Sequence, residues 1–539
     1  MNRGGPVLVS VVVPVFNAGP YIETCVGSIL DQSLPRGKVE AILVDDGSTD
    51  DTPARIDALA AGNPTIRVIH QEPSGWPGKP RNVGMAAARG RYLFFLDNDD
   101  TLGREALDRM CAMATRNASD IVVGKMAGFH RPVPKDLFFA NRERATLADA
   151  PLIEALTPHK LFRRAFVEEH RLRFPEGRRR LEDHVFVLAA YFAAGSISVL
   201  SDYVCYYHIR RDDRSNAGGR ALEPAGYYGN LREVLGIVQE HTQPGHLRDR
   251  LLERFARVEL LGRLRGRAFL DHTDAHRNDL FEAIRSVVAD HIPVSVDALL
   301  APHQRVQMAL LRARRLDLLI DFAEADVLLT ARARVGRVTR SGSAFRIEFE
   351  ARLMRGSAPF ALDDGTGVPL LPVPGAVAAA VPADARTLAG PAQPTARLVL
   401  RKRDDWAELV APTHLRPPAG DARGSDGLTL HAEATVDPVV LSVGLPVWPG
   451  RWDVIARVEA FGSTRDTHLG SVGTSDLLPS PGSIDLGGRT IRRIAPYWTG
   501  PTGKLAFKVT DVCVRPLYRR LLSRIRRAIS RPTAPGSRP

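Results

Sequence analysis

Acidic side chains gather at the end of an apolar segment in RGRYLFFLDNDD, residues 89–100. The apolar run YLFFL is typical of a buried strand, and Asp97, Asp99 and Asp100 follow it directly. Neighbouring carboxylates repel one another unless a positive group lies between them. Two carboxylates separated by one residue can bind one divalent cation, and such oxygen ligands suit Mg²⁺ or Mn²⁺. The pattern therefore predicts a metal ion that bridges to the phosphate oxygens of a ligand.

Two more apolar segments end in polar residues that could serve a nucleotide. VSVVVPVFN ends in Asn17, and EAILVDDGSTD carries Asp45 and Asp46 before a Gly-Ser-Thr turn. In an open α/β sheet, ligands bind beyond the carboxyl ends of the strands. Taken alone, such a motif is more often a turn or a helix cap than a ligand site. Their order within about 100 residues of one α/β pattern favours a shared binding site.

The elements that position these residues follow from the alternation of apolar patterns. Up to about residue 215, strand-like segments alternate with helical ones, which predicts a mostly parallel, Rossmann-like sheet flanked by helices. The expected helices lie around Tyr21–Asp31, Thr52–Ala61 and Pro80–Ala88.

In the rest of the chain the pattern of apolar residues changes twice, first to a helical one and then to an alternating one. Stretches such as LRDRLLERFARVELLGRLRGRAFL predict helices, and later runs such as AFRIEFEARLM and RWDVIARVEAF alternate as β-sandwich strands do. A chain of 539 residues is also too long for one core. We expect an α/β domain at 1–219, a helical linker at 220–325, an all-β region of one or two sandwich modules at 326–505, and a tail at 506–539.

Composition narrows the class of protein. The four cysteines lie far apart and form no CxxC pair, which argues against a zinc site or a disulfide framework. We find no signal-peptide pattern and no apolar run of membrane-spanning length, and we expect a cytoplasmic active domain.

The net charge of +12 is concentrated near the end of the chain. From Arg515 onward the tail holds eight arginines and no acid, and its leucines and isoleucines fall on one helical face. This pattern predicts a basic amphipathic helix that binds the anionic inner face of a membrane. The alternative is a solvated basic end. Nucleic acid is not expected as a partner, because no recognised nucleic-acid motif accompanies the charge.

The N-terminal motifs together resemble the family 2 glycosyltransferases, which have the GT-A fold. The matching segments are VVVPVFNAGPYIETCVGSILDQS, ILVDDGSTDDT, GKPRNVGMAAARGRYLFFLDNDD and LEDHVFVLAAYFA. The resemblance covers residues 8 to about 215 and implies a UDP-sugar donor, Mn²⁺ or Mg²⁺, and inversion at the anomeric carbon.

The resemblance assigns roles to donor-site residues. It implies that Pro14, Asn17 and Asp46 lie near the base and ribose, with Asp45 close by. Asp97 and Asp99 match the family's DxD motif, with Asp99 as the direct metal ligand. The family also has donor contacts in the stretch that holds Lys79, Arg81 and Asn82.

An inverting transfer needs one base to take the acceptor's proton, because the diphosphate leaving group is already a stable anion. LEDHVF matches the family's ED motif, which makes Asp183 the base and gives Glu182 an orienting or acceptor-binding role. The structural alternative is that these acids only stabilise the start of a helix.

A second group of residues follows the last strand of this domain, in YVCYYHIRRDDRSNAG. By the same resemblance, His208 ligates the metal while Arg211 and Ser215 bind diphosphate oxygens. Arginine is well suited to bidentate phosphate contacts. Arg210 and Arg214 are alternatives to Arg211.

The three-part layout is similar to that of wall teichoic acid glycosyltransferases, some of which trimerise through C-terminal modules. It implies a poly(polyol phosphate) acceptor, N-acetylglucosamine as the default sugar, and a possible homotrimer. A basic protein would attract such a polyanion. The alternatives are a capsular or lipid-linked acceptor, a non-catalytic carbohydrate-binding protein, and a scaffold organised by the β modules.

Overall fold

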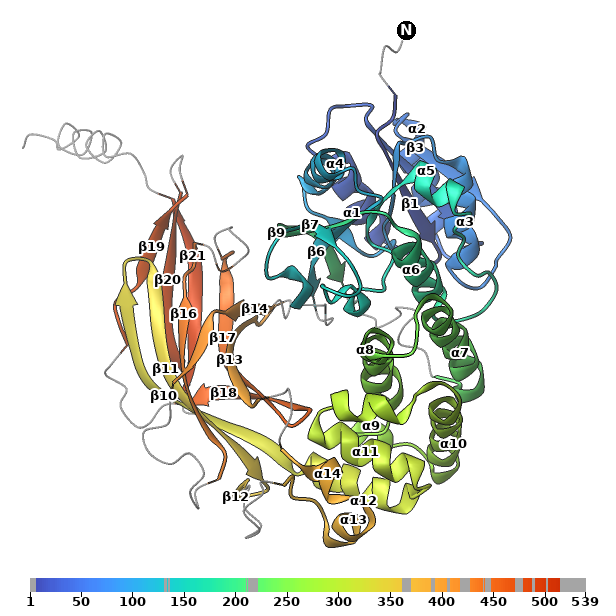
Figure 1. Ribbon diagram of the computed structural model, residues 1–539. Coiled ribbons are helices and arrows are strands. Elements are labelled where there is room, and N and C mark those ends of the chain that lie inside the picture. Colours follow the sequence, from blue (N-terminus) through green and yellow to red (C-terminus); the bar gives the residue numbers. More distant parts are fainter. Residues whose placement is uncertain are drawn as a thin grey trace, which may run out of the picture.

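The chain folds into an α/β domain, a group of helices and a large β-sheet, in that order along the sequence (Figure 1). The computed structural model describes residues 6–129, 133, 136–209, 211, 222–360, 370–388, 393–404, 408–416, 427–439, 441, 447–470, 478–486, 490–500 and 503–513. Ser215, Arg210, Arg214 and the basic tail from Arg515 lie outside these residues. This architecture confirms the expected fold class of an α/β domain, a helical linker and a strand-rich C-terminal region.

The α/β domain is built on a nine-stranded sheet with the order β3-β2-β1-β4-β8-β6-β9-β5, in which β7 pairs with β9. The strands are β1 Val9–Val15, β2 Val39–Asp45, β3 Ile66–His70, β4 Tyr92–Phe95, β5 Thr101–Leu102, β6 Ile121–Phe129, β7 Arg142–Ala145, β8 Leu161–Arg163 and β9 Ile197–Ile209. The first four run parallel to one another. Their carboxyl ends therefore meet at one edge of the sheet.

The central strands are apolar on both faces because helices cover both faces. Every residue of β1, β2 and β4 is buried. The helices are α1 Tyr21–Leu30, α2 Thr52–Ala61, α3 Gly78–Ala87, α4 Ala106–Asn117, α5 Arg164–Glu169 and α6 Glu182–Ala193, with short 3₁₀ turns η1 Asp136–Phe138 and η2 Leu152–Glu154. Helix α3 approaches β1 so closely that a Cβ at Gly84 would lie 2.3 Å from the Val12 side chain. Glycine is therefore required there.

The linker is helical, as expected, but its longest basic stretch is not one regular helix. Helix α8, His246–Phe255, passes into a π-helical turn η4, Ala256–Leu260, and a 3₁₀ turn η5, Leu261–Arg263. The other elements are α7 Pro224–His241, α9 Gly266–Leu270, α10 Asp274–His291, η6 Val294–Leu299, α11 Pro302–Arg312 and α12 Leu316–Val327.

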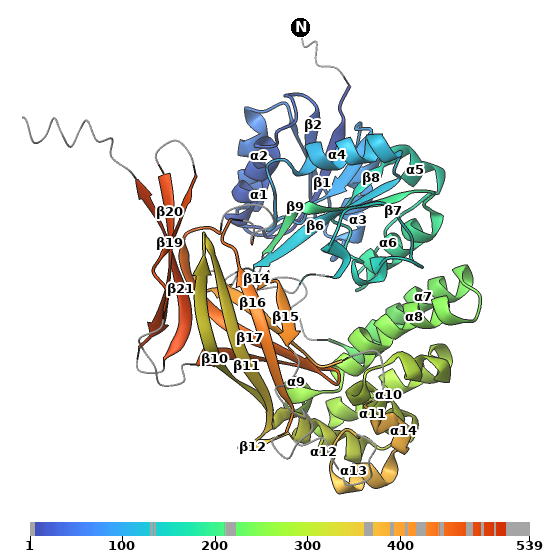
Figure 2. The ribbon, with the colours of Figure 1, turned by 60° about the vertical axis from the view of Figure 1, so that its left-hand side comes forward.

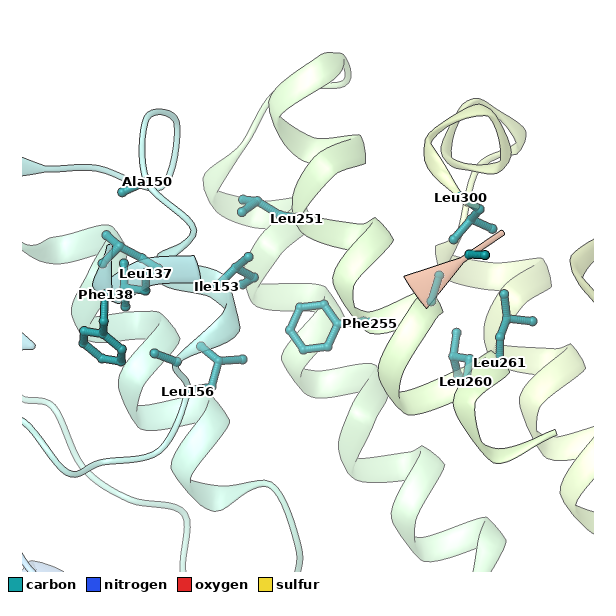
Figure 3. Close-up of a cluster of buried hydrophobic side chains, with 14 of the residues drawn as sticks. Leu137, Phe138, Ala150, Ile153, Leu156, Leu251, Phe255, Leu260, Leu261 and Leu300 are labelled. Carbon is teal, nitrogen blue, oxygen red and sulfur yellow. The ribbon is translucent and has the colours of Figure 1, made fainter. Parts of the chain in front are cut away.

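The linker shares a hydrophobic core with the α/β domain. Leu251 and Phe255 of α8 lie beside Ile153 and Leu156 of the α/β domain (Figure 3), and all four are buried in one continuous cluster. At the rim, Arg250 donates a hydrogen bond to the Ala148 carbonyl at 2.9 Å. Burial of apolar area favours this contact by roughly 25 cal/mol per Å², so the two parts form a packed unit.

The C-terminal region forms a 12-stranded sheet network whose main path is β14-β13-β17-β21-β18-β10-β11-β16-β15, with β12, β19 and β20 off this path. The strands are β10 Leu329–Ser341, β11 Ala344–Arg355, β12 Ala358–Pro359, β13 Thr395–Lys402, β14 Glu408–Ala411, β15 Thr413–Arg416, β16 Thr429–Val436, β17 Gly450–Ala460, β18 Ser463–Gly470, β19 Gly482–Asp485, β20 Thr490–Thr499 and β21 Lys504–Cys513. Among the helices of the described ranges, none is long and apolar enough to cross a membrane.

Two parts of the β region return to the linker helices. The turn between β17 and β18 docks there, because the Phe461 carbonyl accepts a hydrogen bond from the His303 amide at 2.8 Å and the Gly462 carbonyl accepts one from Arg265 at 3.0 Å. Helices α13, Gly375–Ala380, and α14, Ala383–Arg386, pack on α12 and α11 (Figures 1 and 2). The β region is therefore anchored to the linker at points far apart in sequence.

Candidate active site

The acids that follow β4 form the centre of the candidate site. Asp99 and Asp100 are buried, whereas the Asp97 side chain is 31% exposed. The Asp100 carboxylate accepts hydrogen bonds from the Tyr206 hydroxyl and from the Ile209 amide. Burial and the nearby Asp99 and Asp97 carboxylates raise the pKa of Asp100 well above its ordinary value. The end of β9 therefore holds the last acid of this segment in place.

Arg81 connects these acids to the start of helix α6. Its guanidinium donates to Asp97 Oδ1 and to Glu182 Oε1, each at 2.9 Å, and its side chain is only 4% exposed. Residues 81, 97 and 182 come from α3, the end of β4 and the first turn of α6. Since a buried charge is costly unless it is paired, this ion pair network holds the three elements in one arrangement.

Glu182 and Asp183 occupy different environments although they are neighbours. Glu182 is buried and also accepts a hydrogen bond from Trp76 Nε1 at 2.7 Å. Burial, followed by the neighbouring Asp183, raises the pKa of Glu182 to about 7. The Asp183 side chain is 24% exposed and accepts a hydrogen bond from the His184 ring at 2.8 Å. Burial opposes its ionisation, but His184 holds the pKa of Asp183 below the ordinary value.

A group of side chains that could hold a cation lies at the same edge of the sheet. Asp97, Asp100 and His159 each offer one ligand atom, and these atoms lie within 4.8 Å of one another. Burial lowers the pKa of His159 to about 4, so its imidazole is neutral at neutral pH, the form that binds metals. Two carboxylates and a neutral imidazole fit a divalent cation such as Mn²⁺ or Mg²⁺.

Asp99 and His208, the other expected metal ligands, lie beside this group. His208 Nε2 is 3.9 Å from Asp100 Oδ2. Asp99 Oδ2 accepts a hydrogen bond from Arg211 Nε at 2.8 Å. Arg211 also donates to the Asn17 carbonyl at 2.9 Å and lies over the Tyr21 ring. The structure thus brings Arg211 to the acids that follow β4.

The polar ends of β1 and β2 form a neighbouring surface. Asn17 has a left-handed backbone (φ 43°), and its amide oxygen accepts a hydrogen bond from the Thr49 amide at 2.8 Å. Asp45 caps the Gly-Ser-Thr turn through the Ser48 amide at 3.1 Å. Asp46 accepts hydrogen bonds from Ser74 and from other groups of the segment after β3. Two distant loops are thereby joined at the expected nucleotide edge.

The remaining predicted residues lie near this edge. Pro14 is in β1, opposite Val44 of β2. Lys79 is half-buried in the first turn of α3. The amide of Asn82 is bonded to protein groups, since it donates to the Phe174 carbonyl and to Glu176 and accepts from the Phe174 amide. Asn82 therefore holds the 174–176 segment against α3.

Sequence reasoning missed four residues that contact the predicted ones. Trp76 and His159 stand in segments without a recognisable pattern, and only the fold brings them to Glu182 and Asp97. His184 follows Asp183 directly, and its adjacency was the one available signal. Glu259, in the linker, lies near the His184 ring and carried no signal in the sequence.

An open α/β sheet that gathers acids and a candidate cation site beyond the carboxyl ends of its strands is typical of enzymes that bind nucleotides there. Comparisons with known proteins identify the family. Residues 10–204 match the model of glycosyl transferase family 2, and residues 224–323 match that of the glycosyl transferase TarS linker domain. The chain therefore contains a family 2 glycosyltransferase domain followed by a TarS linker domain, which confirms the family expected from the sequence.

Characterised relatives cover part of the chain. A poly(ribitol-phosphate) β-glucosyltransferase of Bacillus spizizenii is 30% identical over 307 residues, which is 56% of this chain and 48% of the relative. The poly(ribitol-phosphate) β-N-acetylglucosaminyltransferase TarS of Staphylococcus aureus is 31% identical over 314 residues, 57% of this chain and 54% of the relative. The matching region thus spans about half the length of these relatives.

Solved structures match a larger part of the chain than these relatives do by sequence. The crystal structure of S. aureus TarS matches 94% of this chain and 86% of its own, with a TM-score of 0.53 and 21% identity, which shows a shared fold. The complex of TarS residues 1–349 with UDP-GlcNAc matches 59% of this chain and 91% of its own, with a TM-score of 0.53 and 29% identity.

Proposed function

We propose that this protein is an inverting, metal-dependent enzyme that transfers a sugar from a UDP-sugar to a poly(polyol phosphate) of the cell envelope. The proposed default sugar is N-acetylglucosamine. The relatives named for poly(ribitol-phosphate) transfer and the TarS complex with UDP-GlcNAc support this choice. The observation that carries the proposal is the pair of Arg81 contacts, which unites the acids after β4 with the acid pair of α6 in one site.

The nucleotide part of the donor would bind at the edge formed by the ends of β1 and β2. Pro14, Asn17 and Asp46 are proposed to lie near the base and ribose, with Asp45 close by. Their loops are joined by hydrogen bonds, so the edge is preorganised for a rigid ligand. Lys79 is proposed to contact the donor from the start of α3, and Asn82 to support the neighbouring 174–176 segment.

The diphosphate is proposed to lie at the acids that follow β4. Asp97, with Asp100 and His159, offers the donor set for a divalent cation, and Asp99 and His208 stand beside it. A bound Mn²⁺ or Mg²⁺ would neutralise the diphosphate and so make it a better leaving group. Arg211 supplies a fixed positive charge at the same place, and Ser215 is proposed to assist it.

Asp183 is proposed to take the proton from the acceptor hydroxyl. Its lowered pKa keeps it ionised at neutral pH, and its side chain is more exposed than that of Glu182. Glu182 is suited to orientation, because both of its oxygens are held by Arg81 and Trp76. One accessible, ionised carboxylate beside a buried, fixed one is the arrangement that a single displacement needs.

Release of nucleotide diphosphate across a panel of UDP-sugars with Mn²⁺ tests the proposal. Each donor is assayed with and without poly(ribitol phosphate), with EDTA and with Asp183→Asn as controls. Turnover that needs acceptor, metal and Asp183 supports the proposal and names the sugar. Metal-dependent donor binding without transfer would point to a capsular or lipid-linked acceptor. Absence of donor binding would favour the non-catalytic, carbohydrate-binding alternative.

Location and assembly are proposed from the sequence of the C-terminal part. Residues 506–513 lie in β21, so the tail begins later than the expected boundary at 506. The basic segment from Arg515 onward is proposed to hold the enzyme at the inner face of the membrane, where the charge of +12 would also attract a polyanionic acceptor. The β region is proposed to form a homotrimer. Sedimentation with anionic vesicles, with and without the residues after 513, tests the first proposal, and light scattering tests the second.

A further inference from the structure

Glu259 is a buried acid of the linker that lies outside the family 2 domain. Its side chain is 8% exposed. One oxygen accepts a hydrogen bond from Arg254 at 3.0 Å, and the other accepts one from the Tyr227 hydroxyl. Arg263 approaches it at 4.0 Å. Three linker groups thus fix the position and the negative charge of this carboxylate.

The backbone around Glu259 is also unusual. Glu259 stands in the π-helical turn η4 that follows α8, and its carbonyl accepts a hydrogen bond from the Tyr228 hydroxyl at 3.2 Å. Such turns are rare and occur frequently at functional sites. Directly before this turn, Phe255 packs in the core shared with the α/β domain (Figure 3). The turn is therefore held against the catalytic part of the molecule.

The His184 ring lies between Glu259 and the proposed base. Its Nδ1 is 2.8 Å from Asp183 Oδ1, and its Nε2 is 3.8 Å from Glu259 Oε1. A neutral imidazole carries one N–H and would turn a bare nitrogen toward one of these carboxylates. Only the imidazolium presents an N–H to both. At 3.8 Å the contact of Nε2 with Glu259 is longer than a hydrogen bond, and Nε2 has no hydrogen-bond partner in the described residues, so Glu259 acts on the ring through its charge.

The charges around the ring agree with this protonation state. Burial opposes the charged ring, but Asp183 and Glu259 outweigh burial and raise the pKa of His184 to about 9, although Arg254 lowers it. Arg254, Tyr227 and Arg263 contact Glu259 from within the linker.

On the other side of the site, Arg81 faces Asp183 and helps to lower its pKa. Asp183 in turn opposes the lowering of the Lys160 pKa that burial causes. In the described residues, Glu259 is the one carboxylate outside the family 2 domain that is paired with His184.

We propose that Glu259 is a positioning residue of the active site, which acts through the His184 imidazolium to fix the orientation of Asp183 and keep it ionised. This inference rests on the proposed function, because it needs Asp183 to be the base. Its consequence is that the linker domain completes the catalytic machinery and does more than connect two domains.

The test compares Glu259→Gln with Glu253→Gln in the full chain, with UDP-GlcNAc and poly(ribitol phosphate) as substrates. Glu253 is a matched control, since it lies on α8 and pairs with Arg257 at 2.9 Å. We expect kcat to fall about ten- to a hundredfold in Glu259→Gln, as for other outer-shell partners, with the donor KM within twofold. The alkaline limb of the pH–rate profile should move to lower pH, because the His184 imidazolium loses a carboxylate that favours its protonated form. Glu253→Gln should retain the wild-type profile.

A second variant and a direct measurement keep the inference testable if Glu259→Gln does not fold. His184→Gln leaves the Glu259 cluster with Arg254 and Tyr227 intact and should show a similar loss in kcat. Its acid limb should move to higher pH, because Asp183 loses the positive neighbour that lowers its pKa. NMR of ¹⁵N-labelled histidine should find the His184 ring doubly protonated at pH 7.5 in the wild type.

A neutral His184 ring at pH 7.5, or a His184→Gln variant with wild-type kcat, would overturn the inference. Equal kcat values for the Glu259→Gln and Glu253→Gln variants would also overturn it. Failure of the proposed function has a different signature, namely an Asp183→Asn variant that transfers sugar as fast as the wild type.

Discussion

Arg81 of the α/β domain and Arg334 of the β region are paired with acids in opposite ways. Arg81 is 4% exposed and bridges two acids that lie 16 and 101 residues away along the chain. In the β region, Arg334 is 54% exposed and pairs with Glu350, which stands directly opposite it on the neighbouring strand. Removing one partner of a buried ion pair strongly lowers the free energy of unfolding, whereas an exposed cross-strand pair contributes little to it. The contrast indicates that the buried pairs of Arg81 hold the candidate site together, whereas the Arg334 pair belongs to the solvent-exposed surface of the sheet.

The largest effect is expected for Asp183→Asn. Loss of the base should lower kcat by about 10²–10⁴-fold, with thermal unfolding near the wild-type temperature. Asp108→Asn is the control, because Asp108 is likewise an acid in the first turn of a helix, α4. Equal losses in both variants would show that these acids act only on helix stability.

The next effect is on stability and follows from removal of Arg81. Arg81→Met leaves Asp97 and Glu182 without their shared partner, and we expect a loss of about 3–5 kcal/mol in the free energy of unfolding. Urea unfolding measures this loss, and donor binding should weaken in parallel. A fully stable Arg81→Met variant would mean that the acids are neutralised in another way.

A smaller effect concerns the pH dependence of stability. The pKa of His184 is about 9 in the folded protein against an ordinary 6.5, so its contribution is fully present below 6.5 and is lost as pH rises through 9. The shift corresponds to about 3 kcal/mol. Wild-type stability should therefore fall between pH 6.5 and 9.5, and His184→Gln should flatten this part of the curve. An unchanged slope in the variant would show that groups other than His184 cause the fall in stability.

The smallest effect is expected in the β region. Arg334→Gln breaks the pair with Glu350 but leaves the strand pairing intact, so the free energy of unfolding should change by about 0–1 kcal/mol. Sugar transfer should stay at the wild-type rate. A loss as large as that of Arg81→Met would remove the distinction between the two regions.

The sequence predicts those parts of the site that local patterns encode. Alternating apolar segments predict the sheet, and acids that directly follow a strand, such as Asp97, or begin a helix, such as Asp183, are visible as motifs. The contacts of Trp76, His159 and Glu259 were not predictable, because they join segments far apart in the chain whose local sequence has no distinctive pattern. The π-helical turn was missed for a related reason, since apolar periodicity does not distinguish a π turn from the α-helix that precedes it.

Helices α13 and α14 have a practical consequence for dissecting the molecule. They belong by sequence to the C-terminal half, yet they cover α12 and α11 of the linker, with Val377 fully buried. A fragment that ends at the last linker helix would lose this cover and expose an apolar surface to solvent. A domain boundary chosen from the sequence alone would therefore separate segments that pack together in the fold. A stable truncated protein would have to include residues 370–388 together with the linker.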